Sequence, residues 1–306
     1  MDSDREGWLA IVNPRSGGAR GRSAWSSIEA ALQRASLQLT VAWTAGPGEG
    51  EAQARRAVQS GHRRILVAGG DGSVHDAVNG IMSAGLADTS EVTLAVAPLG
   101  TGNDWARSLG VRRDPQAIAA CLSAGRTVLH DVGLIEFPTS PRVDGRWFIN
   151  VAGSGLDAQM VATLPPLVPS GLTYLRGALQ GLASYRSPEF NLQADGVRIA
   201  GKFLVAFVAN GRYCGNRMHV APDASLDDGL FELVAIDELA LPRVLVKLPK
   251  LYLGTILTDP CVHHCRAASV RIDAEPATAV QADGQLVGHT PAVFSLRHRA
   301  LGVVVA

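Results

Sequence analysis

Residues 66–82, LVAGGDGSVHDAVNGIM, join an apolar run to a helical pattern through a turn that holds three glycines and Asp71. The run RILVA (64–68) is typical of a strand buried on both faces of a sheet. The segment after the turn has apolar residues at i, i+4 and i+7, namely Val74, Val78 and Ile81. This spacing puts them on one face of a helix. The stretch therefore predicts a strand-to-helix unit of a parallel sheet.

The same alternation extends over the first 130 residues. Three further apolar runs predict strands: WLAIV (8–12), LQLTVAW (37–43) and VTLAVA (92–97). Helical patterns lie between them, with Ile28, Leu32 and Ala35 on one face of the first and Ala54 and Val58 on one face of the second, which we expect Gly61 to end. Residues 1–130 are therefore predicted to form an α/β domain.

After HDVGLIEF (130–137) the chain changes to short β-rich runs separated by Gly, Pro, Asn and Asp. These runs predict a second, mostly β domain over residues 131–306, and the last residues are left open to pack on the first domain. Two helical patterns interrupt it, GLTYLRGALQGLASY (171–185) and LPRVLVKLPKLYLGTIL (241–257).

The second of these patterns mixes basic and large aliphatic residues. Arg243, Lys247 and Lys250 are its charged members, and Pro249 is expected to break the helix. A basic amphipathic helix can lie on an anionic membrane surface, but a helix packed on its own domain with one solvated side has the same pattern. The sequence leaves both interpretations open.

Composition excludes several classes of protein. Lysine plus arginine and aspartate plus glutamate are balanced at 28 each, so no overall charge favours a nucleic-acid partner. Four cysteines in 306 residues are too few for a disulfide scaffold. The acidic start MDSDREGW is unlike a signal peptide, and no apolar run approaches membrane-spanning length. We therefore expect a soluble, cytoplasmic protein without a transmembrane segment.

A glycine turn that opens a helix provides backbone N–H groups for an anion, but Asp71 brings negative charge into it. A triphosphate bound with Mg²⁺ resolves this conflict, because the metal reverses the local charge preference. The alternative is a tight β-to-α turn in which Asp71 accepts hydrogen bonds from its own loop.

Two more loops of this kind follow predicted strands. One is NPRSGG (13–18), which begins with Asn13, and the other is PLGTGND (98–104), which contains Gly100 and Thr101. The carboxyl ends of parallel strands meet at one edge of a sheet, where open α/β sheets bind ligands. The three loops therefore predict a nucleotide site.

The order of NPRSGG, GGDGSVHDAVNG and PLGTGNDWA resembles the catalytic domain of the diacylglycerol kinase and sphingosine kinase family, of the bacterial lipid kinase type. The blocks NVAGSGLDAQ (150–159), VANGRYCGN (208–216), APDASLDDGLFEL (221–233) and QADGQ (281–285) extend the resemblance over most of the chain. It implies an α/β domain with the parallel sheet of NAD kinases and phosphofructokinases, plus a C-terminal β-sandwich. ATP and a lipid would meet in the cleft between the domains.

Matching to the family's motifs implies the site residues. The nucleotide-binding set is Asn13, Thr44, Gly69, Gly70, Asp71, Gly72, Ser73, Val74, His75, Gly100, Thr101, Asn103 and Asp104. The family's catalytic acid lies in an Asp-Gly-Glu block, where this chain has Asp283, Gly284 and Gln285. Because the neutral Gln285 cannot accept a proton, Asp283 is the predicted base and Asp71 the second choice.

The acidic loop DASLDDG (223–229) suits a hard cation. The resemblance assigns a structural Mg²⁺ there to the carbonyl oxygens of Ser225 and Leu230 and the side chain of Asp228. A solvated Asp-Gly turn is the alternative.

The run CVHHC (261–265) has the residue types of a zinc site. Alternating side chains on a strand point to opposite faces, however, and no distant partner pair is evident. We therefore expect a polar strand end.

The sequence thus predicts an ATP- and Mg²⁺-dependent lipid kinase of phospholipid biosynthesis, peripheral to the membrane, whose acceptor is a lipid at the membrane surface. Residues 162–179 are the candidate wall for acyl chains, or else a buried connection. Two alternatives remain, a soluble-substrate kinase of the NAD kinase type and a non-catalytic nucleotide-binding regulator. The acceptor and the existence of a homodimer stay open.

Overall fold

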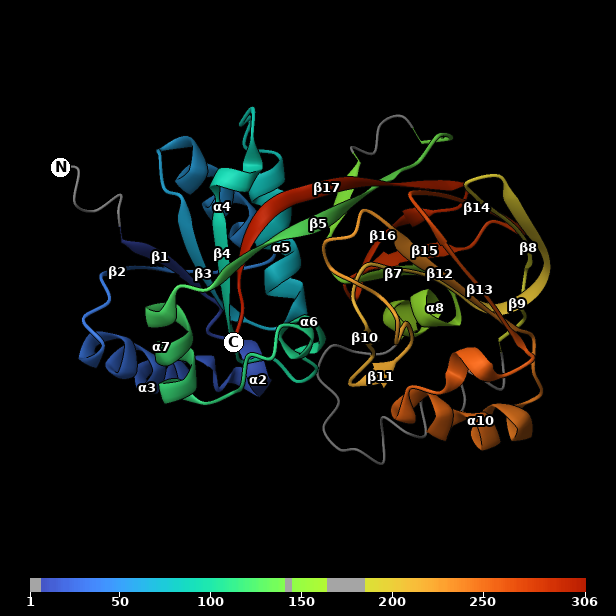
Figure 1. The fold of residues 1–306 in the computed structure, drawn as a ribbon, viewed down its shortest axis with the longest axis horizontal. Coiled ribbons are helices and arrows are strands. Elements are labelled where there is room, and N and C mark those ends of the chain that lie inside the picture. Colours follow the sequence, from blue (N-terminus) through green and yellow to red (C-terminus); the bar gives the residue numbers. More distant parts are fainter. Residues whose placement is uncertain (1–6, 141–144, 164–184) are drawn as a thin grey trace. The chain divides into compact units, whose positions relative to one another are not determined.

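The computed structural model describes residues 7–140, 145–163 and 185–306 (Figure 1). The chain divides into two compact units. Unit 1 comprises Met1–Val132 with Arg297–Ala306, and unit 2 comprises Gly133–Leu296. No helix among the described residues is long and apolar enough to span a bilayer.

Unit 1 is built on a parallel sheet in the order β4-β3-β1-β2. Its strands are β1 (Trp8–Val12), β2 (Leu39–Trp43), β3 (Arg64–Gly69) and β4 (Thr93–Pro98). These are the four predicted strands, and their parallel pairing is confirmed. The end of β17 (Ala292–Val304) adds a strand parallel to β4, with Gly302 opposite Thr93.

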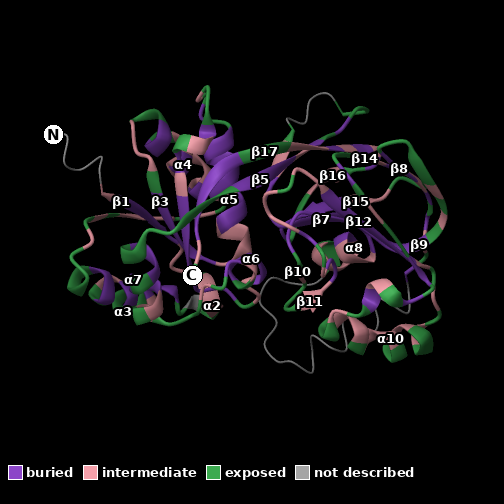
Figure 2. Cartoon of the chain, in the orientation of Figure 1, coloured by how far each residue is buried: buried purple, intermediate pink, exposed green. Residues whose placement is uncertain are grey.

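Helices cover this sheet. They are α2 (Ser16–Ala19), α3 (Gly21–Arg34), α4 (Glu49–Gln59), α5 (Asp71–Met82), α6 (Asp104–Ser108) and α7 (Pro115–Ala124), with the short 3₁₀ helix η1 (Thr89–Glu91). The face of α5 that the sequence predicts to be apolar is buried. Figure 2 shows buried residues in purple. Gly61 has a φ of +101° just after α4, as predicted. The prediction for Ala35 is wrong, because α3 ends at Arg34 and leaves Ala35 exposed.

Unit 2 is mostly antiparallel β structure. Its strands are β6 (Arg146–Phe148), β7 (Val151–Gly155), β8 (Glu189–Ala194), β9 (Val197–Ala209), β10 (Tyr213–Cys214), β11 (Met218–His219), β12 (Phe231–Asp237), β13 (Val262–Ala267), β14 (Ser269–Glu275), β15 (Ala279–Ala282) and β16 (Gln285–His289). The strand β5 (Thr127–Glu136) enters from unit 1 and pairs with β6.

The long strand β9 belongs to two layers of unit 2. Its first half, from Val197 to Lys202, pairs with β8, and its second half pairs with β7 and β12. The apolar faces of these layers form a common core that includes Phe148, Phe231 and Phe294. Phe148 stacks on Phe231 with ring centroids 5.5 Å apart. This core is the sandwich that the short alternating runs predict.

Unit 2 also contains the helices α8 (Leu156–Thr163) and α10 (Leu241–Leu253), and the 3₁₀ helix η2 (Ile256–Thr258). The expectation that Pro249 breaks the second helix is wrong, because α10 continues through it and ends at Gly254. A proline frees the carbonyl group four residues earlier, here that of Leu245. Since Leu245 is exposed, water can bind that carbonyl group. Except for Tyr185, the predicted helix at 171–185 lies outside the described residues.

Candidate active site

The predicted glycine loops lie together at the carboxyl ends of β1, β3 and β4. The Nδ2 of Asn13 in the first loop donates a hydrogen bond to the Oγ of Ser73 in the second, over 3.1 Å. A Cβ on Gly17 of the first loop would lie 2.6 Å from the carbonyl oxygen of Leu99, next to the third. The convergence predicted from the parallel strands is therefore confirmed within unit 1.

The second and third loops touch through their backbones. A Cβ on Gly100 would lie 2.5 Å from the Cα of Gly70, and the N–H of Leu99 donates to the carbonyl oxygen of Gly69 over 2.8 Å. Side chains cannot fit between backbones at this separation, so both positions need glycine. The loops therefore present backbone groups, as phosphate-binding loops do.

Asn103 closes the third loop. Its φ is +52°, and its side-chain amide makes two hydrogen bonds with the backbone of Gly100, accepting from the N–H over 2.9 Å and donating to the carbonyl oxygen over 2.8 Å. Thr101 is exposed between these two residues. Asn103 thus shapes the loop, and the contact of Thr101 with a nucleotide stays a prediction.

Asp71 begins α5 and lies beside the third loop. Its Oδ1 accepts the N–H of Trp105 over 3.2 Å. A Cβ on Gly102 would lie 3.1 Å from the Oδ2 of Asp71 and 3.5 Å from the Oδ2 of Asp104. Two carboxylates therefore flank Gly102, and oxygen donors of this kind are the ligands that Mg²⁺ prefers. These residues fit a nucleotide with its magnesium ion.

The remaining predicted nucleotide contacts differ in exposure. Thr44 follows β2, and its N–H donates to the carbonyl oxygen of Val12 over 3.0 Å, so it lies beside the first loop. Val74 and His75 are buried, and the Nε2 of His75 lies 3.3 Å from the Nδ2 of Asn79 in the next turn of α5. These two side chains therefore belong to the packing of the helix, which argues against a contact of the His75 side chain with phosphate.

In unit 2, Asp283 occupies the turn between β15 and β16. Its φ is +50°, and that of Gly284 is +81°, as in a two-residue hairpin turn of type I′. The buried carboxylate accepts three backbone N–H groups over 2.9 to 3.3 Å, those of Ile149, Asn150 and Val151. The three bonds use both oxygens to hold the start of β7. Gln285, in contrast, is exposed.

Asp157 is a second carboxylate in this part of unit 2, in the first turn of α8. The Nε2 of Gln281 donates to its Oδ2 over 3.0 Å, while its buried Oδ1 has no hydrogen-bond partner among the described residues. Burial raises the pKa of Asp157 to about 6, against the lowering effect of Gln281. The Oε1 of Gln281 accepts the N–H of Gly284 over 2.9 Å, so Gln281 links Asp157 to the Asp283 turn.

Tyr185 adds a second unused polar group near Asp157. Its hydroxyl is buried and has no hydrogen-bond partner among the described residues. Burial, and then the charge of Asp157, raise the pKa of this phenol, so it stays protonated. Reasoning from the sequence missed both residues, because a pKa set by burial cannot be recognised in a motif.

The acidic loop at 223–229 forms an ion pair with a basic side chain from outside the loop. The Oδ2 of Asp228 forms an ion pair with Arg266, and its Oδ1 accepts the N–H of Leu230 over 3.0 Å. The Nε of Arg266 lies 3.1 Å from the Oε1 of the buried Glu232. The Oγ of Ser225 donates to Asp227 over 3.0 Å. A divalent cation at Asp228 would compete with Arg266, and the Mg²⁺ site at Ser225, Asp228 and Leu230 stays a prediction.

The CVHHC run lies at the start of β13. The Nε2 of His263 lies 2.9 Å from the Oδ1 of Asp237, and all four cysteines of the chain are free. Within the described ranges, no group of three or more His, Cys, Asp or Glu side chains is arranged to hold a metal ion. The predicted acyl-chain wall at 162–179 lies outside the described residues, apart from its first two positions.

Known protein families match both units. Residues 7–135 match the diacylglycerol kinase catalytic domain, and residues 150–305 match the YegS C-terminal NAD kinase beta sandwich-like domain. A diacylglycerol kinase of Bacillus subtilis is 27% identical over 298 residues, which are 96% of this chain and 95% of the relative. A YegS-like lipid kinase of Pseudomonas fluorescens is 30% identical over 271 residues, 87% of this chain and 85% of the relative.

A solved structure has the same fold. The crystal structure of a diacylglycerol kinase from Bacillus anthracis superposes with a TM-score of 0.74 at 22% identity, covering 98% of this chain and 97% of the other. The predicted fold, an α/β domain with a parallel sheet followed by a mostly β sandwich domain, is therefore confirmed.

Proposed function

Since the chain belongs to the family of diacylglycerol kinases and YegS-like lipid kinases, we propose that it transfers the γ-phosphoryl group of ATP to a hydroxyl group of a lipid such as diacylglycerol or phosphatidylglycerol. The convergence of the three glycine loops carries the nucleotide part of this proposal. The names of the relatives support the lipid part.

The phosphates of ATP bind at the glycine loops of unit 1, where the N-terminus of α5 adds its dipole. The carboxylates of Asp71 and Asp104 would hold Mg²⁺, which would supply positive charge to offset that of the phosphates. In phosphoryl transfer the protein contributes mainly positioning and electrostatic stabilisation. Asp71 therefore acts on the charge of the nucleotide complex, and the backbone of the loops fixes its position.

The acceptor hydroxyl must lose a proton. Asp283 is the base predicted from the sequence, but its three backbone N–H donors favour a role in holding the loop. Asp157 has a buried oxygen without a partner among the described residues and a pKa of about 6. A base that titrates near neutral pH is the more effective one. We therefore assign the proton to Asp157 and the shaping of its surroundings to Asp283.

A lipid-panel kinase assay tests the function. The purified protein is incubated with Mg²⁺, labelled ATP and one acceptor at a time: diacylglycerol, phosphatidylglycerol, a sphingoid base, an isoprenoid-like alcohol or NAD. We expect label in at least one lipid. Label in NAD alone would identify a soluble-substrate kinase, and ATP binding without transfer to any acceptor would identify a non-catalytic regulator.

Asp157→Asn is expected to make the protein more stable but less active. The raised pKa means that the folded state binds a proton more tightly than the unfolded state, so folding loses stability as pH rises from about 4 through about 6. At pH 8 the neutral asparagine avoids this loss, a gain of about 1 to 3 kcal/mol in the free energy of unfolding. At pH about 4 the gain disappears, because Asp157 is then protonated in the folded state.

Urea unfolding at the two pH values measures this gain, and kcat/KM is expected to fall at least about tenfold in the same variant. The control is Asp195→Asn, which neutralises an exposed carboxylate that accepts two backbone N–H groups. Equal effects of Asp157→Asn on the free energy of unfolding at both pH values would show that the ionised carboxylate of Asp157 does not destabilise the folded state.

A further inference from the structure

Helix α10 carries an unusual concentration of exposed apolar side chains. Of the eight large hydrophobic residues that are exposed among those described, four lie on this helix. Val246 and Leu253 are 78% and 75% exposed, and Leu245 and Tyr252 about half exposed. No residue of α10 is buried, and Figure 2 accordingly shows the helix in green and pink. A surface helix normally turns its apolar side chains toward the core.

These side chains form one continuous stripe. The exposed members follow the spacing i, i+3, i+4, i+7, i+10 and i+11 when the two prolines are included, namely Pro242, Leu245, Val246, Pro249, Tyr252 and Leu253. At 3.6 residues per turn this spacing covers about one third of the circumference of the helix. The exposed apolar side chains of α10 therefore lie together on a single face of the helix.

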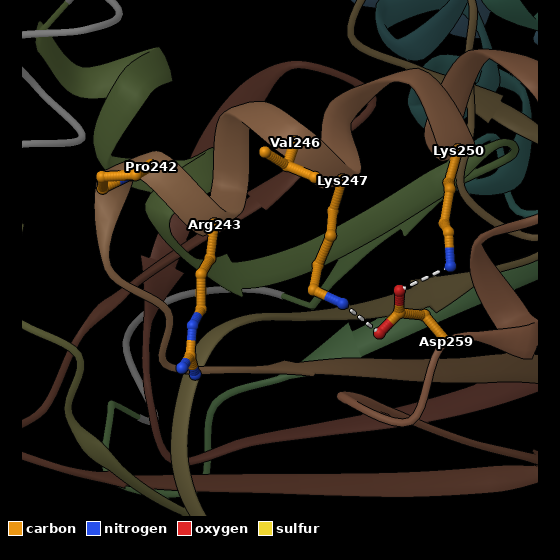
Figure 3. Close-up of a pocket in the computed structure, with 6 residues that line it drawn as sticks. All are labelled: Pro242, Arg243, Val246, Lys247, Lys250 and Asp259. Carbon is orange, nitrogen blue, oxygen red and sulfur yellow. Dashed lines mark hydrogen bonds and ion pairs between the residues drawn. The ribbon is translucent and has the colours of Figure 1, made fainter.

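Contacts on the other sides of α10 fix its orientation. The Nζ atoms of Lys247 and Lys250 lie 2.5 and 2.7 Å from the two carboxylate oxygens of Asp259, whose side chain is 1% exposed (Figure 3). Leu251 packs against the core of unit 2. A Cβ on Gly254, which ends the helix, would lie 2.5 Å from the Nδ1 of His219. The helix cannot turn its stripe inward without breaking these contacts.

The charges of α10 have one sign. Arg243, Lys247 and Lys250 are its only ionisable residues apart from Tyr252. In Figure 3 the three basic side chains extend to the same side of the helix, where a recess of about 330 Å³ is lined by them, Pro242, Val246 and Asp259. Asp259 offsets one of the three positive charges. A net positive flank therefore borders the apolar stripe.

We propose that α10 is a membrane-docking helix that lies in the surface of an anionic phospholipid bilayer, with its stripe among the upper acyl chains and its basic flank at the lipid phosphates. An apolar face beside a basic flank, without acidic residues, is the composition of interfacial helices. The choice of a bilayer as occupant extends the proposed function, because a lipid kinase must reach a substrate that resides in a membrane.

The size of the stripe also favours a bilayer over a second protein. A helix of 13 residues is about 20 Å long and about 10 Å wide, so one face offers roughly 200 Å². A stable protein interface buries about 800 Å² per partner. An interfacial helix needs only its own apolar face, buried about 5 to 10 Å deep.

Vesicle co-sedimentation without nucleotide tests the proposal. The full chain is mixed with vesicles of phosphatidylcholine alone or with about one third phosphatidylglycerol. We expect binding to the anionic vesicles that weakens with added NaCl, and at least tenfold weaker binding for the double variant Val246→Glu/Leu253→Glu. The control Val128→Glu/Val197→Glu, which places the same two charges at exposed sites on β5 and β9, should bind like the wild type.

Thermal unfolding checks that the double variant is folded, and phosphorylation of a short-chain lipid in solution checks its active site, which should be unaffected. Binding of the double variant equal to that of the wild type would overturn the proposal. A wild-type dimer in solution that the double variant converts to a monomer would instead make the stripe a contact between copies. Binding that persists in a protein without kinase activity would overturn the proposed function alone.

Discussion

Asp71→Asn is expected to lower kcat/KM of phosphoryl transfer by at least about 100-fold, or about 2.7 kcal/mol of transition-state stabilisation, and to leave the fold intact. Asparagine has the size of aspartate and an oxygen that can still accept the N–H of Trp105. The substitution therefore removes one negative charge and little else. That charge is the reason to expect a large effect, because the magnesium ion proposed to screen the phosphates would be held by carboxylate oxygens.

The control for this variant is Asp114→Asn. Asp114 also accepts a backbone N–H with its Oδ1, that of Ala117 over 2.8 Å at the start of α7, but it is outside the loops. The two variants should differ by less than about 1 kcal/mol in the free energy of unfolding, since each keeps its hydrogen bond. Activity of Asp71→Asn within threefold of the wild type would remove the charge of Asp71 from the mechanism.

The second large effect is expected for Gly100→Ala. The added methyl group would lie 2.5 Å from the Cα of Gly70, where neither backbone can move without distorting its strand end. Overpacking of this kind costs about 1 to 3 kcal/mol of folding free energy. Because the displaced loops are those proposed to bind the phosphates, the Kd for ATP should rise at least about tenfold.

Gly46→Ala is the matched control, because a Cβ at Gly46 would meet nothing within 4 Å and its φ is not in the left-handed region. Isothermal titration with ATP and urea unfolding on both variants separate the loop contact from the general cost of losing a glycine. Unchanged ATP affinity in Gly100→Ala would place the nucleotide away from the third loop.

The parallel sheet and its three loops were predictable because they depend on local patterns. A buried strand, a glycine turn and a helix with a 3.6-residue period follow one another in the chain, so residues 66–82 suffice for the prediction. Parallel strands then bring the loops together without further information. The close contact between Gly70 and Gly100 shows two of these loops brought together in this way.

Contacts between distant residues were not predictable. Nothing near Asp283 indicates that its carboxylate binds the backbone of residues 149–151, more than 130 positions earlier. The raised pKa of Asp157 depends on burial, which a motif does not contain. The ion pair between Asp228 of the acidic loop and Arg266 of β13 joins residues 38 positions apart, and no motif indicates it. The prediction for Pro249 was wrong because the effect of a proline inside a helix depends on whether the carbonyl group that it frees can bind water.

The two layers of unit 2 share the strand β9. Because this one strand supplies hydrogen bonds to β8 at one end and to β7 and β12 at the other, loss of β9 would remove a pairing partner from both layers at once. The sandwich should respond to damage as one cooperative body, and the Asp157 and Asp283 environments would be lost together.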